Sequence, residues 1–128
     1  MTVLVGYIPD QYGEAALAAA IEEADRRGTD LLVLNASRGD ALVDKRYLGE
    51  SQLGDLERRL ADSGVAHEIR QSVGSDAADE LVAAAGVADD PVIVIGMRHR
   101  TPVGKLIMGS TAQRILLDAP CWVIAVKP

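Results

Sequence analysis

Short apolar runs alternate with longer segments of helical periodicity along the entire chain. Each run is too short for a buried helix and is bounded by glycine, proline or polar residues, so each predicts a strand. The predicted strands cover residues 3–7, 31–36, 65–73, 91–96 and 122–126. The predicted helices cover residues 13–27, a segment through Leu53, Leu56 and Leu60 that ends at Gly64, residues 76–85, and residues 110–118, where Ala112, Ile115 and Leu116 are expected to face the core.

Strict alternation of strand and helix predicts a parallel sheet, because each strand must return to the same edge through a helical crossover. Right-handed crossovers place helices on both faces of the sheet. We therefore predict one α/β domain over residues 1–128, a doubly wound five-stranded parallel sheet with strand order 3-2-1-4-5. The β-branched run in residues 91–96 should lie inside the sheet, and the loosely alternating residues 65–73 should lie nearer an edge.

Composition excludes several classes of protein. With 48% apolar residues the chain can bury a core, yet no apolar run approaches the roughly 20 residues of a membrane helix. There is no basic head or cleavage site at the N-terminus, so neither export nor a membrane partner is expected. Cys121 is the single cysteine, which rules out an intrachain disulfide and a cysteine metal cluster, and we expect it to be a small buried side chain. These features favour the cytoplasm.

The charge is negative overall but locally positive. A net charge of −6 argues against a nucleic-acid partner, since phosphate backbones require a basic face. Residues 91–117, however, contain Arg98, Arg100, Lys105 and Arg114 and no acidic residue. Such a segment suits a phosphorylated small molecule, and a solvated loop is an equally compatible interpretation.

In an open doubly wound sheet a ligand binds at the carboxyl ends of the strands where the strand order reverses. Here that point lies between the first and fourth strands, at the loops over residues 7–12 and 96–109. The latter contains neither a Walker motif nor G-x-G-x-x-G. It does end in Gly109-Ser110-Thr111 at the start of a helix, where free backbone N–H groups can hold a phosphate. The alternative is that Ser110 and Gln113 form an S-x-x-Q capping box that serves only the helix.

The spacing of Gly96, His99 and Gly109-Ser110 resembles the nucleotide-binding signature G-x2-G-x9-G-[ST] of the universal stress protein family, with His99 in place of the second glycine. The similarity extends through residues 112–116, the turn at residues 119–121, the last strand and the start of the first helix. It implies an adenine nucleotide alpha hydrolase-like fold, binding of ATP or another adenine nucleotide with Mg²⁺ only as its companion, and a homodimer through the last strand.

The resemblance and the predicted crevice together give the candidate nucleotide-binding residues: Gly6, Tyr7, Ile8, Ala36, Ile95, Gly96, Arg98, His99, Arg100, Gly109, Ser110 and Thr111. Three of them depart from the family pattern. Ile8 replaces an aspartate that faces the adenosine, and Ala36 replaces a valine of the base pocket. His99 either crowds the phosphates or, when protonated, helps to neutralise them.

Three functions are compatible with these residues. The first is a stress-response regulatory module that binds an adenine nucleotide. The second is a nucleotide-free dimer that acts through protein contacts, with Trp122, Val123, Ile124, Ala125 and Val126 at its interface and Trp122 in place of the family's usual proline. The third is a slow ATP hydrolase, for which His99 is the one candidate base and no acidic metal ligand lies nearby. We expect no catalytic residues, no metal site and at most marginal ATPase activity.

Overall fold

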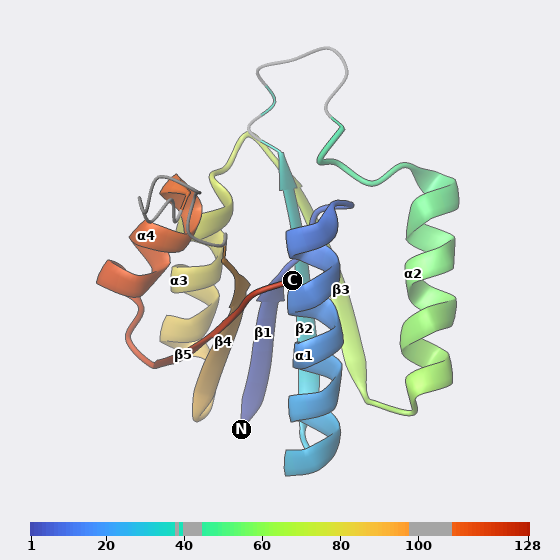
Figure 1. The fold of residues 1–128 in the computed structure, drawn as a ribbon, viewed down its shortest axis with the longest axis horizontal. Helices are drawn as coiled ribbons and strands as arrows, with labels where there is room; N and C mark the ends of the chain where they lie inside the picture. The colour runs from blue at the N-terminus through green and yellow to red at the C-terminus, as the bar shows by residue number, and fades with distance from the viewer. Residues whose placement is uncertain (38, 40–44, 98–108) are drawn as a thin grey trace.

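Five strands alternate with four helices in the computed structural model, which describes residues 1–37, 39, 45–97 and 109–128 (Figure 1). The strands are β1 (Thr2–Gly6), β2 (Asp30–Ser37), β3 (His67–Val73), β4 (Pro91–Gly96) and β5 (Trp122–Val126). The helices are α1 (Gln11–Arg27), α2 (Glu50–Ser63), α3 (Ala77–Val87) and α4 (Ser110–Asp118). Every predicted element is present, and β4, α4 and β5 have the predicted bounds.

The strands form one parallel sheet in the order β3-β2-β1-β4-β5, which confirms the predicted fold class and topology. The central strand β1 pairs with β2 on one side and β4 on the other, so that Val3 lies between Leu31 and Val92. As predicted, β4 is an interior strand and β3 is an edge strand. The point at which the strand order reverses therefore lies between β1 and β4.

Apolar side chains cover both faces of the sheet, because successive residues of a strand point to opposite sides. Val3 and Val5 of β1 belong to the cluster that packs against α1 and α2, together with Leu17 and Leu60. Leu4 belongs to the cluster on the opposite face, which packs against α3 and α4. Figure 1 shows α3 and α4 side by side on that face. No helix in the described part of the chain is long and apolar enough to cross a membrane.

The helix α4 has a narrower buried face than the sequence predicted. Ala112 and Ile115 are buried, but Leu116 is 41% exposed and Leu117 is 76% exposed. The expectation that Leu116 faces the core is therefore wrong. The physical reason is that α4 packs chiefly against α3 and not across the sheet, so only one narrow stripe of the helix is covered.

Candidate functional site

A cleft of about 430 Å³ opens at the carboxyl end of the sheet, at the predicted reversal of strand order. We call it the main cleft. Its walls come from the ends of β1, β2 and β4 and from the first residues of α1, α3 and α4. It is lined by Gly6, Tyr7, Ile8, Asp10, Tyr12, Gly13, Leu34, Ala36, Arg46, Ser75, Asp76, Ala77, Leu81, Ile95, Gly96, Gly109, Ser110, Thr111, Ala112 and Ile115.

Nine candidate residues from the sequence lie together in the main cleft. They are Gly6, Tyr7, Ile8, Ala36, Ile95, Gly96, Gly109, Ser110 and Thr111. The other three, Arg98, His99 and Arg100, lie outside the described residues. The four separate segments that contain these nine residues thus meet as the topology required, since parallel strands end at the same edge of a sheet.

Gly96 is required by the packing of the protein itself. A β-carbon at this position would lie 2.4 Å from the carbonyl oxygen of Tyr12 in the first turn of α1. A backbone atom cannot move aside as a flexible side chain can. The first glycine of the signature therefore brings the end of β4 against the start of α1, whether or not a ligand is present.

The start of α4 differs from the other two helix starts in the described main cleft. Asp10 caps α1, its carboxylate accepting a hydrogen bond from the Gly13 N–H at 2.7 Å. Asp76 caps α3 in the same way through the Ala78 N–H at 2.8 Å. The N-cap of α4 is Gly109, which has no side chain. Its φ of 80° and ψ of 148° belong to a region that is essentially limited to glycine.

The proposed capping box of Ser110 and Gln113 is therefore wrong, because Ser110 is the first helical residue and not the N-cap. A helix begins with backbone N–H groups that have no partner inside the helix. At α1 and α3 a carboxylate satisfies part of this need, whereas Gly109 offers nothing equivalent. Among the helix starts in the described cleft, α4 is therefore the one whose N-cap residue carries no negative charge.

Asn35 holds the β2 side of the main cleft together. It is fully buried, and its Nδ2 donates to the carbonyl oxygens of Tyr7 at 2.9 Å and Arg46 at 2.7 Å. Its Oδ1 accepts from the Leu48 N–H at 2.9 Å and from Nε2 of Gln71 at 3.1 Å. One side chain thereby joins the residue that follows β1, strand β3 and the segment before α2. A lone amide inside the apolar run of residues 31–36 was the sequence signal for this role.

A second polar network ties β1 to two helices. The Tyr7 hydroxyl donates to one carboxylate oxygen of Glu14 on α1, and Arg59 on α2 donates to the other. Burial and the Glu14 carboxylate raise the pKa of Tyr7 to about 12. Burial alone would raise the pKa of Glu14, but the hydrogen bonds from Tyr7 and Arg59 outweigh it and lower that pKa. At neutral pH the network therefore holds a neutral phenol and an ionised carboxylate.

Tyr7 also lines a smaller cleft of about 240 Å³ between α1 and α2, with Glu14, Leu56 and Arg59 among its other lining residues. The ring belongs to the core cluster on the α1 and α2 face of the sheet. Tyr7 consequently forms part of the wall between the two clefts.

Arg114 belongs to the basic segment of the sequence, and the structure places acidic partners beside it. Its guanidinium forms an ion pair with Asp79 and lies 3.6 Å from the Asp76 carboxylate, both in the first turn region of α3. These carboxylates, Asp79 first, raise the pKa of Arg114 above its usual value. Within the described ranges no group of three or more acidic, histidine or cysteine side chains could hold a metal ion.

Sequence reasoning missed much of the α3 side of the cleft. Ser75, Asp76 and Ala77 follow β3, whose carboxyl end lies at the same edge of the sheet as the ends of β1 and β4. The topology indicates them, because the segment after β3 also begins at this edge of the sheet. Asp10 and Tyr12 lie in the predicted loop over residues 7–12 but were not among the candidate residues. The other lining residues that were not predicted are Gly13, Leu34, Arg46, Leu81, Ala112 and Ile115.

Comparison of the sequence with known proteins identifies one family over almost the whole chain. The model of the universal stress protein family matches residues 1–127. A universal stress protein of Mycolicibacterium smegmatis is 54% identical over 126 residues, which are 98% of this chain and 97% of that protein.

Solved structures give the same result. A universal stress protein from Archaeoglobus fulgidus superimposes with a TM-score of 0.80 at 30% identity, over 99% of this chain and 98% of that one. The universal stress protein from Archaeoglobus fulgidus in complex with dAMP shares the fold, with a TM-score of 0.67 at 24% identity over 99% and 98% of the two chains. The chain belongs to the universal stress protein family.

Proposed function

We propose that the main cleft binds an adenine nucleotide, and that the protein is a cytoplasmic stress-response regulatory module. The observation that carries this proposal is the start of α4, where Gly109 leaves the helix without a capping side chain inside a cleft that also has apolar walls. A helix N-terminus of this kind attracts an anion through its N–H groups and its dipole. The complex of the Archaeoglobus fulgidus protein with dAMP supports the choice of an adenine nucleotide.

In this proposal the phosphates lie against the backbone of Gly109, Ser110 and Thr111. Each hydrogen bond to a charged phosphate oxygen contributes about 1.5 to 3 kcal/mol, and the helix dipole adds about 0.3 to 1 kcal/mol. Mg²⁺ would enter with the nucleotide, since the described part of the chain holds no cluster of acidic ligands for it.

The base and sugar then occupy the side formed by β1, β2 and the end of β4. Ile8, Leu34, Ala36 and Ile95 give this side an apolar character. Ile8 stands where family members often have an aspartate, so the sugar and base gain apolar contact there without a carboxylate acceptor. We therefore expect the phosphates to dominate the affinity, and ATP to bind more tightly than adenosine.

Dimerisation through β5 is the second part of the proposal. The two edges of the sheet differ in how they resist pairing. The edge strand β3 exposes Glu68 and Arg70, paired at 2.8 Å, whereas β5 contains no charged residue and exposes 75% of Trp122. Charged side chains protect an edge against pairing with another chain, so β5 is the edge suited to a second copy. Trp122, Val123, Ile124, Ala125 and Val126 would form that interface.

The alternatives are a nucleotide-free dimer and a slow ATP hydrolase. The hydrolase has less support, because the two carboxylates that line the described main cleft, Asp10 and Asp76, each cap a helix. A carboxylate held in this way is a poor candidate for a general base.

Isothermal titration calorimetry with ATP, AMP and adenosine tests the proposal. We expect the affinity to fall in that order as phosphate groups are removed. Absence of heat with millimolar ATP would leave the nucleotide-free dimer as the better description. Equal affinity for ATP and adenosine would show that the start of α4 holds no phosphate.

A further inference from the structure

The position of α4 depends on α3. Ala112 and Ile115 of α4 share an apolar cluster with Ala78 and Leu81 of α3, and α3 is the principal neighbour of α4. Arg114 lies one turn beyond Ser110, so the two residues occupy the same side of α4. From there Arg114 reaches the first turn region of α3, where it meets Asp79 and Asp76. The ion pairs thus join the two helix starts that form one wall of the main cleft.

Asp76 introduces a negative charge into this wall. It lines the main cleft, its side chain is 18% exposed, and its Oδ1 lies 2.8 Å from the Ala78 nitrogen and 3.6 Å from Nη1 of Arg114. A phosphate at Gly109–Thr111 would share the cleft with this carboxylate. Two negative charges in one cleft repel each other, and the partial burial of Asp76 weakens the screening by water.

We infer that Arg114 is a positioning residue that permits phosphate binding by neutralising Asp76, without contacting the nucleotide itself. The inference rests on the proposed function, because it concerns the charge that the cleft can accept. Asp76 cannot simply be replaced by an apolar residue, since it also caps α3. Capping requires a polar side chain at this position, and the carboxylate that serves here has the Arg114 guanidinium 3.6 Å away to offset its charge.

Calorimetry with ATP and with adenosine tests this on the full chain. Arg114→Gln should weaken ATP binding about 1.5-fold to fivefold, as expected for the loss of a partly exposed ion pair, and should leave adenosine binding unchanged. Asp76→Asn should tighten ATP binding, because asparagine still caps a helix but carries no charge. The double variant Arg114→Gln/Asp76→Asn should bind ATP at least as tightly as the wild type.

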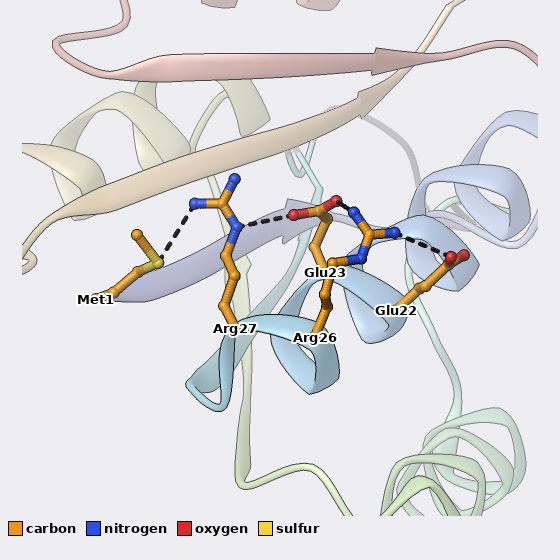
Figure 2. A network of polar contacts seen from close by, with 5 residues as sticks. All are labelled: Met1, Glu22, Glu23, Arg26 and Arg27. Carbon is orange, nitrogen blue, oxygen red and sulfur yellow. Dashed lines mark hydrogen bonds and ion pairs between the residues drawn. The ribbon is translucent and has the colours of Figure 1, made fainter.

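Arg26→Gln is the matched control. Arg26 on α1 pairs with Glu23 at 2.8 Å and Glu22 at 3.1 Å on the helix surface (Figure 2), and none of these three residues lines the main cleft. Arg26→Gln removes an arginine from two acidic partners, as Arg114→Gln does, yet this substitution should not alter the affinity for ATP.

The outcomes separate the two claims. If the wild type binds no ATP, the proposed function and this inference are both wrong. If the wild type binds ATP and Arg114→Gln binds it equally well, the inference alone is wrong. Equal weakening of ATP and adenosine, without recovery in the double variant, would mean that Arg114 merely holds α4 in place, and would also overturn it. Should Arg114→Gln fail to fold, the expected tightening in Asp76→Asn decides the question.

Discussion

Gly96 and the carbonyl of Tyr12 are in such close contact that a β-carbon on Gly96 would lie 2.4 Å from the carbonyl oxygen. The end of β4 is therefore pressed directly against the first turn of α1. Both residues line the main cleft, and their contact allows no side chain at residue 96.

Gly96→Ala should consequently destabilise the protein by about 1 to 3 kcal/mol, the usual cost of overpacking a rigid site. Urea unfolding measures the change. Gly54→Ala is the control: Gly54 lies within α2, where a β-carbon would meet nothing within 4 Å. That substitution should stabilise the protein by about 0.5 to 1 kcal/mol through helix propensity. Equal effects of the two substitutions would contradict the close contact.

Replacement of Asn35 by alanine should lower the free energy of unfolding by about 2 to 4 kcal/mol. The change leaves the Leu48 N–H and the Tyr7 carbonyl without their buried partner, and a buried unpaired polar group costs about 1 to 3 kcal/mol. Gln71→Ala should cost less, since it leaves the Asn35 bonds to Tyr7 and Leu48 intact. Chemical denaturation followed by circular dichroism gives both values, and a loss below about 0.5 kcal/mol for Asn35→Ala would refute this account.

The phenol of Tyr7 should lose its proton only at high pH. Its pKa in the folded protein is about 12, against 10.0 for a free tyrosine, so its contribution to stability is complete below pH 10 and is lost as the pH rises through about 12. Spectrophotometric titration of the three tyrosines should reveal a late transition that disappears in Tyr7→Phe. Glu14→Gln should move it to lower pH by removing the carboxylate partner. A late transition that persists in Tyr7→Phe would assign the shift to another tyrosine.

Trp122→Glu should convert a dimer into a monomer, because it places a charge in the apolar edge of the sheet. Light scattering at micromolar concentration gives the mass. Val73→Glu is the matched control, since Val73 is 62% exposed on the opposite edge strand. It should leave the mass unchanged. A wild type that is already monomeric, or a Val73→Glu variant that dissociates as readily, would exclude an interface at β5.

The alternation of strands and helices could be predicted because it follows from local periodicity. The location of the main cleft then follows from the expected strand order by a general rule of topology. Gly96 and Gly109 were found in the same way, as glycines directly after a strand and before a helix. What could not be predicted depends on contacts between distant residues. Arg114 meets Asp79, which lies 35 positions earlier, and the sequence contains no sign of that pairing.

Two local patterns also misled. Leu116 follows the helical spacing of a buried residue, but the docking of α4 on α3 leaves it uncovered. Ser110 and Gln113 have the spacing of a capping box, but the N-cap is Gly109, and Ser110 is the first residue of the helix. At Leu116 the packing between helices decided the outcome, and at Ser110 the position of the N-cap decided it. In neither case was the spacing of the residues sufficient.

The helix caps formed by Asp10 and Asp76 bear on how an anionic ligand would be oriented in the main cleft. At two of the described helix starts around the main cleft, a carboxylate of the protein already occupies the place that an anion would take. The start of α4 is the one left open by its glycine cap. If the main cleft binds a molecule with one charged end and one apolar end, as we propose, the charged end should therefore face the start of α4, and the cleft would set the orientation of that ligand as well as its charge.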